Sequence, residues 1–491
     1  MAWRERVVSA PLAHGSAREL TRAAVNSTAK ADVVPVVEKI REWLCFLAIL
    51  FASGDLWPTV TIGFNFRFSQ LCMLAALAIS PGLLLRDGVR LFPGWSALYL
   101  FAIWLFATLP FSLFVTRSIG YTFWAVTDVL IIFIFVQTFR TETALVRLVS
   151  YFLQSFVLLA LFGMVQFGLG LFGVGVLVSQ WWIPDVLPRI NGISYEPSFY
   201  ATYLVCGWVL SCYLLERGVD VPSRRLLKVC AFTTTIALLL ATSRLGWAMM
   251  LLWGLFRAAE RAFLIFTGRR MRTRSAAMFL ASPLVIAALL VFSGPWSQSV
   301  LRAASEASFL FSGVGLLGAP SHSVAIRAGD VQETWNAFAA HPLTGTGIGA
   351  VPAEIAAARG NRILTLEDAK PNEGMSIFVE ILASTGIVGL ALLTAFAVAV
   401  VRGCVKTARW APPWRVELLR GVGWSVIWVL LALQFSQNLL RVWFFIDIAV
   451  LICCLTASPQ RAPAVVPGAV RPPVRSTFSQ RPISRPASTN R

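Results

Sequence analysis

The sequence predicts an all-α polytopic membrane protein with about 12 transmembrane helices and one large loop outside the membrane that contains short helices. Of its 491 residues, 57% are hydrophobic and only 13% are charged, whereas soluble domains are roughly 45–50% apolar. The formal net charge of +18 lies in short Lys and Arg clusters between apolar runs. This distribution indicates membrane topology and not nucleic-acid binding.

Apolar stretches long enough to cross a bilayer recur along the chain, since a transmembrane helix needs about 20 mostly apolar residues. The predicted spans are residues 44–62, 67–85, 95–115, 119–139, 149–175, 197–215, 226–242, 244–262, 275–293, 375–401, 420–437 and 442–457.

The seventh and eighth predicted spans form one apolar stretch that is interrupted only at Thr242-Ser243-Arg244. If 226–262 were one helix, the basic segments 224–228 and 269–274 would lie on opposite sides of the membrane, against the positive-inside rule. A turn at this interruption instead places both segments, the other basic clusters and both termini in the cytoplasm.

The chain is predicted to have five parts, which begin with a cytoplasmic N-terminal segment at 1–42. Transmembrane helices 1–9 follow in 43–293, the large outer loop in 294–374 and transmembrane helices 10–12 in 375–457. Residues 1–42 carry seven basic and five acidic side chains, so we expect no cleavable signal peptide. The cytoplasmic tail, 458–491, has six Arg, seven Pro and no acidic residue, a composition that favours disorder.

The outer loop 294–374 is predicted to carry function, because loops of this length without function are uncommon. Apolar residues recur within it at steps of seven, four and three, namely Val324, Val331, Trp335 and Phe338. This spacing predicts an amphipathic helix that ends at His341-Pro342.

Three Arg residues are predicted to lie on the outer side: Arg189 in the connector 176–196, Arg244 at the turn and Arg327 on the amphipathic helix. Arg stays charged at every relevant pH, and its planar fork of donors matches phosphate oxygens. A lipid pyrophosphate at the membrane surface is the obvious anion for all three. Arg244 is the strongest candidate, because a charge inside a 37-residue apolar stretch is costly and functional by default.

Each of these Arg residues also has a structural alternative. Arg189 can reach lipid headgroups, Arg244 can cap a helix hairpin, and Arg327 can pair with Asp330 one turn on. The residues alone leave both interpretations open for Arg189 and Arg327.

The segment RINGISYEPSFYATYL, Arg189 to Leu204, ends the 176–196 connector and enters a helix. Pro197 suits the first helical position, and Glu196 just before it suits a cap. Alternatively, the Glu196 carboxylate at the membrane edge acts as general base toward a sugar hydroxyl. Both roles stay open at this point.

The segment HPLTGTGIGAV, His341 to Val351, spaces Gly345, Gly347 and Gly349 in a loop after the amphipathic helix. It follows no strand and lacks a GK[ST] ending, so it is not a P-loop. Tight turns that bring the chain back to the bilayer are the favoured interpretation. His341 is a candidate for substrate binding, with a structural role as its favoured alternative.

Asp128, Glu380 and Asp447 fall within predicted spans, where a lone carboxylate is costly unless it is paired or wet. Proton relay in a transporter is the functional interpretation, yet the chain lacks matching intramembrane Lys or Arg and has no inverted halves of similar sequence. No Cys or His spacing typical of a metal site occurs. We therefore expect neither a metal nor a cofactor.

Three segments together resemble the O-antigen ligase and Wzy-type polysaccharide polymerase superfamily. They are RINGISYEPSFYATYL, then LLLATSRLGWAMMLLW, then HPLTGTGIGA followed by MSIFVEILASTGIVGL. Their combination and order are specific, and they cover Arg189 to about Leu392. The first 180 residues resemble the family only in being hydrophobic.

The resemblance implies a multi-pass glycosyltransferase of the bacterial inner membrane that works in the periplasm, so the 294–374 loop would be periplasmic. It implies a polyprenyl-pyrophosphate-linked oligosaccharide as donor, such as one on undecaprenyl pyrophosphate, and no nucleotide sugar or metal. The expected partners are this lipid-linked glycan, membrane lipids, a chain-length regulator and a flippase, and no nucleic acid.

Family members that resemble ligases carry a His eleven residues before the first glycine of the Gly-Ile-Val-Gly block, a position that Met375 occupies here. This departure favours polymerisation of lipid-linked repeats into an O-antigen, capsule or exopolysaccharide. A ligase that transfers the glycan to another acceptor is the alternative, and a transporter or flippase of lipid-linked sugars is the alternative from another class.

In the predicted mechanism, Arg244 and Arg327, helped by Arg189, bind the pyrophosphate and stabilise its developing charge. Glu196, or less favourably Glu373, takes the proton from the acceptor hydroxyl. The candidates for binding the acceptor sugar are Lys370, Asn372, Glu373 and His341.

Overall fold

A computed structural model describes residues 36–62, 64–183, 187–266, 322–360, 376–435 and 440–459. By its internal contacts the chain forms one compact unit, Met1–Ser458, and a second unit, Pro459–Arg491. The predicted span 275–293, the predicted disordered tail beyond Pro459 and much of the loop 294–374 lie outside the described residues.

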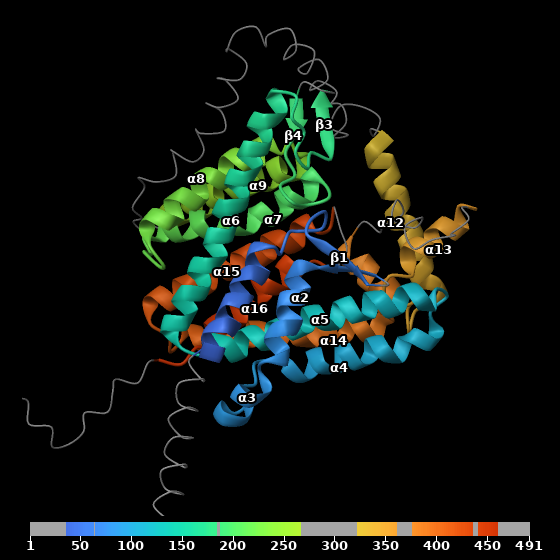
Figure 1. Cartoon of the computed structure of the whole chain (residues 1–491), viewed down its shortest axis with the longest axis horizontal. Coiled ribbons are helices and arrows are strands. Elements are labelled where there is room, and N and C mark those ends of the chain that lie inside the picture. The colour runs from blue at the N-terminus through green and yellow to red at the C-terminus, as the bar shows by residue number, and fades with distance from the viewer. Residues whose placement is uncertain are drawn as a thin grey trace, which may run out of the picture. The chain divides into compact units, whose positions relative to one another are not determined.

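The described residues are mostly helical, as the apolar runs predict, with two short hairpins (Figure 1). A helix over 36–50 comes first. It is followed by α2 (Phe68–Ala78), α3 (Pro81–Asp87), α4 (Trp95–Thr108), the 3-10 turn η1 (Leu109–Phe111), α5 (Val115–Thr138), α6 (Glu142–Leu171), α7 (Pro197–Arg217), α8 (Arg224–Leu240) and α9 (Arg244–Phe266). The later helices are α12 (His322–Ala340), α13 (Val351–Ala358), α14 (Ile377–Ala408), α15 (Pro413–Ala432) and α16 (Val442–Thr456).

Among the described residues, α5, α6, α7 and α14 are each long and apolar enough to cross a membrane, and the bent pair of α2 and α3 could form a fifth span. The chain is therefore a helical membrane protein. Every predicted span except 275–293 overlaps a described helix, while the number of twelve spans stays a prediction.

The first predicted span, 44–62, is wrong at its C-terminal end, because the helix stops at residue 50. Strand β1 (Thr59–Ile62) follows and pairs antiparallel with β2 (Phe64–Arg67). Pro58 cannot continue a helix, and the β-branched residues of Thr59–Ile62 favour a strand. Apolar content alone could not separate this hairpin from the end of a span.

The second predicted span, 67–85, is broken in two, since α2 and α3 are bent by 52°. Pro81 lacks an amide hydrogen and its ring clashes with the preceding turn, so it starts a new helix. The Ser80 hydroxyl donates to the Ala76 carbonyl at 2.6 Å and satisfies one of the freed acceptors.

The predicted turn between the seventh and eighth spans is confirmed, because α8 ends at Leu240 and α9 begins at Arg244. Thr242 adopts a left-handed φ of 48° there. Gly246 lies against Ala201 near the start of α7, and Arg257 pairs with Glu216 near its end. Helix α9 therefore runs parallel to α7 and antiparallel to α8.

Helix α7 is the centre of the described bundle: 89% of its most apolar window is buried, against 33% in α14. It contacts α6, α8, α9 and α15. Gly207 lies so close to Phe156 of α6 that no larger residue fits. The Tyr203 hydroxyl of α7 shares a 3.0 Å hydrogen bond with the Ser155 hydroxyl of α6. Contacts along the whole of α7 thus hold the helix, including its first turn, in place.

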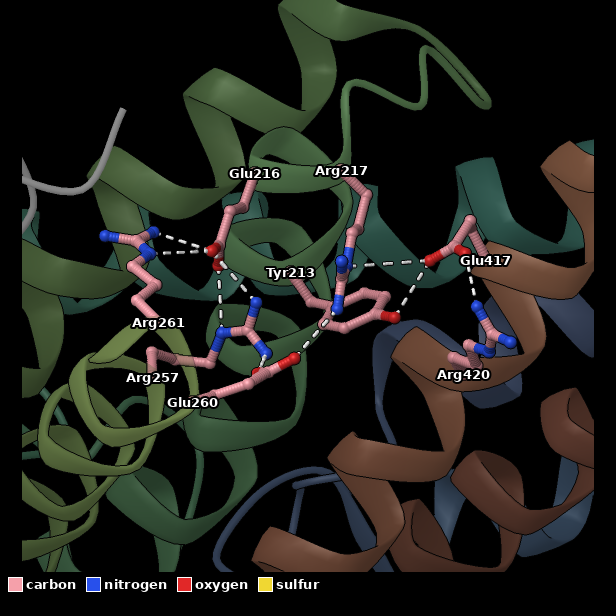
Figure 2. Close-up of polar contacts among 8 residues, drawn as sticks. All are labelled: Tyr213, Glu216, Arg217, Arg257, Glu260, Arg261, Glu417 and Arg420. Atoms are coloured by element: carbon pink, nitrogen blue, oxygen red, sulfur yellow. Dashed lines mark hydrogen bonds and ion pairs between the residues drawn. The ribbon is translucent and has the colours of Figure 1, made fainter. Parts of the chain in front are cut away.

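At the C-terminal end of α7 a network of ion pairs joins three helices (Figure 2). Glu216 accepts from Arg257 at 2.9 Å and from Arg261 at 2.6 Å, and Glu260 accepts from Arg217 at 3.1 Å. The ion-pair network consists of Tyr213, Glu216 and Arg217 of α7, Arg257, Glu260 and Arg261 of α9, and Glu417 and Arg420 of α15.

Three described Arg residues from the basic clusters predicted to be cytoplasmic cap helix C-termini. Arg140 donates to the Asp87 and Gly88 carbonyls at 3.0 and 2.6 Å. Arg90 donates to the Thr456 carbonyl at 2.8 Å, and Arg415 to the Cys454 carbonyl at 2.8 Å. Guanidinium groups thus satisfy carbonyls that a helix end leaves unpaired.

We predict that Arg257→Gln lowers stability by on the order of 3 kcal/mol, because it leaves the Glu216 charge largely buried and partly unpaired. The side chains of Arg257 and Glu216 are 6% and 12% exposed. The control is Arg420→Gln, because the Arg420 side chain is 56% exposed in its pair with Glu417 and should contribute less than about 1 kcal/mol. Thermal unfolding in detergent measures both, and equal effects would contradict the prediction.

Candidate functional site

The loop 190–194 at the start of α7 is held in one conformation by buried hydrogen bonds. Gln166 of α6 accepts from the Gly192 amide at 2.9 Å and donates to the Gly192 carbonyl at 3.0 Å. Asn191, which is fully buried, donates to the Ser194 carbonyl at 2.6 Å. Gly192 has a φ of 58° and lies against the Tyr200 ring, so no other residue suits it. The RINGIS segment therefore forms a rigid platform.

Arg189, at the end of the hairpin of β3 (Gln180–Ile183) and β4 (Leu187–Arg189), is held at the turn between α8 and α9. Its Nε donates to Thr242 Oγ1 at 2.9 Å, and its Nη1 donates to Gln180 Oε1 at 2.7 Å. Burial lowers the pKa of Arg189, Glu196 opposes that shift and Arg244 adds to it. Glu196 and Arg244 therefore each lie within electrostatic range of Arg189.

Arg244 is the first residue of α9, and its side chain is exposed. Within the described ranges its guanidinium makes no hydrogen bond or ion pair with another side chain. It thus differs from Arg189, whose fork is already engaged by Thr242 and Gln180. An exposed cation beside a second cation is suited to binding an anion.

Glu196 occupies the N-cap position of α7, but its side chain does not cap the helix backbone. Its Oε2 instead accepts from the Ser198 hydroxyl at 2.9 Å. The carboxylate is half-buried and close to Arg189. The capping interpretation is therefore not observed, and the carboxylate can accept a proton from a bound hydroxyl.

Arg327 lies on α12, which confirms the predicted helix and its end before His341. The predicted apolar face is wrong, because Trp335 is 47% exposed while Asp330, Thr334 and Ala337 are buried. The side chain of Arg327 is outside the described side chains. Asp330, its suggested partner, pairs with Arg359 at 2.6 Å. The further candidates Lys370, Asn372 and Glu373 lie outside the described residues.

The glycines of the 341–351 segment form tight turns, with φ values of 69° at Gly345, 95° at Gly347 and 78° at Gly349. A Cβ at Gly345 would collide with the backbone of Ser384, and one at Gly349 with the Tyr121 ring. Glycine is required at these positions because the backbone turns tightly, as predicted, and lies close to neighbouring segments.

This glycine loop docks onto a break in α14 at Gly386, whose φ is 67°. The Thr346 amide donates to the Ala383 carbonyl at 2.8 Å, and the Gly347 amide to the Ser384 carbonyl at 3.1 Å. The Ile387 amide in turn donates to the Pro342 carbonyl at 2.9 Å. The loop therefore satisfies backbone groups that the break exposes, as an apolar environment requires.

Sequence reasoning missed that the two late motifs, HPLTGTGIGA and the block around Gly386, bind each other. It also missed Arg117 at the start of α5, which is buried and donates to the Gly349 carbonyl at 2.7 Å. A single charge at the edge of an apolar run was the available signal for Arg117. Nothing local in the sequence identifies its partner.

His341 is half-buried at the base of the glycine loop, where its carbonyl accepts from the Gly345 amide at 2.9 Å. Burial raises the pKa of Glu354 on α13, and His341 opposes that shift. Oε2 of Glu354 has no hydrogen-bond partner among the described residues. Within those residues no cluster of His, Cys, Asp or Glu suited to a metal ion occurs.

One region of the chain matches the model of a known protein family. Residues 229–394 match the model of the Wzy_C family, which is described as O-antigen ligase. The match begins within α8 and includes Arg244, α12, the glycine loop and the break at Gly386, while Arg189 and Glu196 precede it. No curated protein matches the chain.

We predict that Gly386→Ala prevents folding or severely reduces it, because the new Cβ would collide with the Leu343 carbonyl at a left-handed backbone position. The control is Gly423→Ala on α15, where a Cβ meets nothing within 4 Å and should be neutral or stabilising by up to about 1 kcal/mol. Size-exclusion chromatography of detergent extracts measures the folded yield. A normal yield of Gly386→Ala would refute the described fit.

We further predict that Glu354→Gln raises the unfolding temperature relative to the native chain, increasingly as pH rises above the ordinary glutamate pKa of about 4.3. A carboxyl group whose pKa is raised by folding favours the fold when protonated and disfavours it when ionised. Thermal unfolding from pH 4 to 8 measures the difference, with the exposed Arg420→Gln as control. The prediction fails if the gain from Glu354→Gln does not grow with pH.

Proposed function

We propose that this chain, which belongs through its residues 229–394 to the O-antigen ligase and Wzy-type polymerase superfamily, polymerises polyprenyl-pyrophosphate-linked oligosaccharide repeats. The product would be a surface polysaccharide, made on the periplasmic side of the bacterial inner membrane with both termini in the cytoplasm. The expected partners are the lipid-linked glycan, a chain-length regulator and a flippase.

One observation supports the proposal: Arg189 lies within electrostatic range of Arg244, from the turn between α8 and α9, and of Glu196, seven residues along its own segment at the start of α7. The two cations are a fitting environment for a pyrophosphate, since guanidinium groups bind phosphate oxygens with charge-assisted hydrogen bonds. The carboxylate beside them suits the proton transfer that glycosyl transfer to a hydroxyl requires.

In the proposed reaction, the acceptor hydroxyl oxygen attacks C1 of the donor sugar and the bond from C1 to the pyrophosphate oxygen breaks. The leaving lipid pyrophosphate keeps the bonding electron pair, and Arg244, Arg327 and Arg189 stabilise its developing charge. Glu196 takes the proton from the acceptor hydroxyl. Lys370, Asn372, Glu373 and His341 are the residues we propose to bind the sugars.

Polymerisation is favoured over ligation because Met375 occupies the position of the ligase-type His. Transport is less favoured because two of the three intramembrane acids each have one polar partner inside the described bundle. Asp447 accepts from the Ser425 hydroxyl at 2.9 Å, and Asp128 accepts from Gln70 at 3.5 Å. Partnered acids are suited to holding helices together.

The test supplies purified protein in lipid with a polyprenyl-pyrophosphate-linked repeat, without added metal, and separates the glycans by size. We expect a ladder of multiples of the repeat. Arg244→Gln should slow its formation by about 100-fold, as loss of one donor to a developing anion does, and Arg327→Glu should lower polymer yield and length.

The control variant is Arg420→Gln, whose exposed side chain lies in the ion-pair network at the other end of α7. It should give the native ladder. Transfer only to a different acceptor would make the protein a ligase, and absence of any glycosidic product would favour transport. A native rate for Arg244→Gln would refute its role in binding the anion.

A further inference from the structure

A second cluster of charges lies near the start of α7, and none of its members belongs to the proposed anion site. Asp55, between the first helix and β1, pairs with Arg67 of β2 at 3.0 Å and with Arg441 at 2.5 Å. The three side chains, which we call the Asp55 cluster, are 11%, 12% and 5% exposed. The cluster is therefore largely removed from solvent and lipid.

The Asp55 cluster is fastened to the platform that carries Glu196. The neighbouring Leu56 amide donates to the Ile193 carbonyl at 3.1 Å, and the Ser194 hydroxyl donates to the Ser53 carbonyl at 2.9 Å. Segment 53–56 and loop 190–194 thus form one hydrogen-bonded unit, although they are far apart in the sequence.

Arg441 makes the link from the Asp55 cluster to α7 itself. Its guanidinium carbon lies 4.2 Å from the centroid of the Phe199 ring, a cation–π contact. Phe199 belongs to the first turn of α7, where its amide donates to the Glu196 carbonyl at 3.1 Å. A displaced Phe199 would therefore displace the residue that carries the proposed general base.

A purely structural role does not account for this arrangement. Asp55 is shared by two cations, of which Arg67 also lies within electrostatic range of the buried Asp128. Arg441 pairs with Asp55 alone among the described residues, and a cation is unfavourable near a helix N-terminus. Nε of Arg441 also lacks a hydrogen-bond partner among the described residues. An apolar side chain could hold Phe199 without these electrostatic costs, which favours a functional reason for Arg441.

We infer that Arg441 is a positioning residue for glycosyl transfer: through the Phe199 ring it fixes the first turn of α7 and thereby orients the Glu196 carboxylate toward the acceptor hydroxyl. Arg441 is only 4% exposed, so it acts through Phe199 and not by touching substrate. The inference rests on the proposed function, because it assumes that Glu196 accepts the proton.

The experiment is a double-mutant cycle between Arg441→Gln and Glu196→Gln, read as steady-state rates of glycan extension from which kcat and KM are fitted. Arg441→Gln leaves Asp55 paired with Arg67, so it creates no new unpaired acid. We expect it to lower kcat roughly 10-fold or more with KM little changed, as a misplaced catalytic group does. In the Glu196→Gln background, where there is no base to orient, it should change the rate less than about twofold.

Two further variants separate positioning from loss of stability. Phe199→Leu removes the ring and should reproduce the kcat effect and its dependence on Glu196, so it carries the test if Arg441→Gln does not fold. Arg257→Gln, a buried Arg at the other end of α7, is the destabilised control. Any effect it has on the rate should be equal in both backgrounds.

The outcomes distinguish failure of the positioning role of Arg441 from failure of the proposed role of Glu196. If Arg441→Gln and Phe199→Leu lower kcat equally with and without Glu196, or change only KM, the positioning role is overturned while the proposed function stands. If Glu196→Gln itself keeps the native rate, the role of Glu196 in the proposed function fails, and the inference fails with it.

Discussion

The need to satisfy every buried backbone group governs this structure, because lipid offers no hydrogen bonds to replace those that a helix loses. The break of α14 at Gly386 exposes carbonyls that would otherwise be costly, and the glycine loop 341–351 supplies the amides that pair with them. Elsewhere, guanidinium groups such as that of Arg140 donate hydrogen bonds to carbonyl groups at helix C-termini. Each departure from regular helix is thus matched by a specific partner from a distant segment.

Charge is balanced differently at the two ends of α7. At its C-terminal end, four Arg and three Glu alternate in the ion-pair network, so each cation has an acidic neighbour (Figure 2). At its N-terminal end, Arg244 is exposed and has no paired acid in the described part of the chain. The exposed, unpaired Arg244 is suited to an anionic ligand, whereas the paired cations of the ion-pair network are suited to holding helices together.

The sequence was sufficient for features with a local signal. Apolar runs located the helices and the charge at Arg244 located the turn between α8 and α9. Helical spacing located α12 but not its buried face. It was insufficient wherever two distant segments meet. Arg441 and Asp55 are 386 residues apart, and nothing local in either segment shows that they meet. A single charge at the edge of an apolar run shows that a partner is needed without showing which one.

The parallel pairing of α7 and α9 links the two ends. Glu196 begins α7 and Arg244 begins α9, and the ion pairs between Glu216 and Arg257 fix the same two helices near the opposite end. Since both helices rise by about 1.5 Å per residue, pinning one end sets the relative height of the other. Near the site itself Gly246 of α9 packs against Ala201 of α7, so contacts at both ends hold the two helices at one relative height, and loss of one far salt bridge leaves the near contact in place.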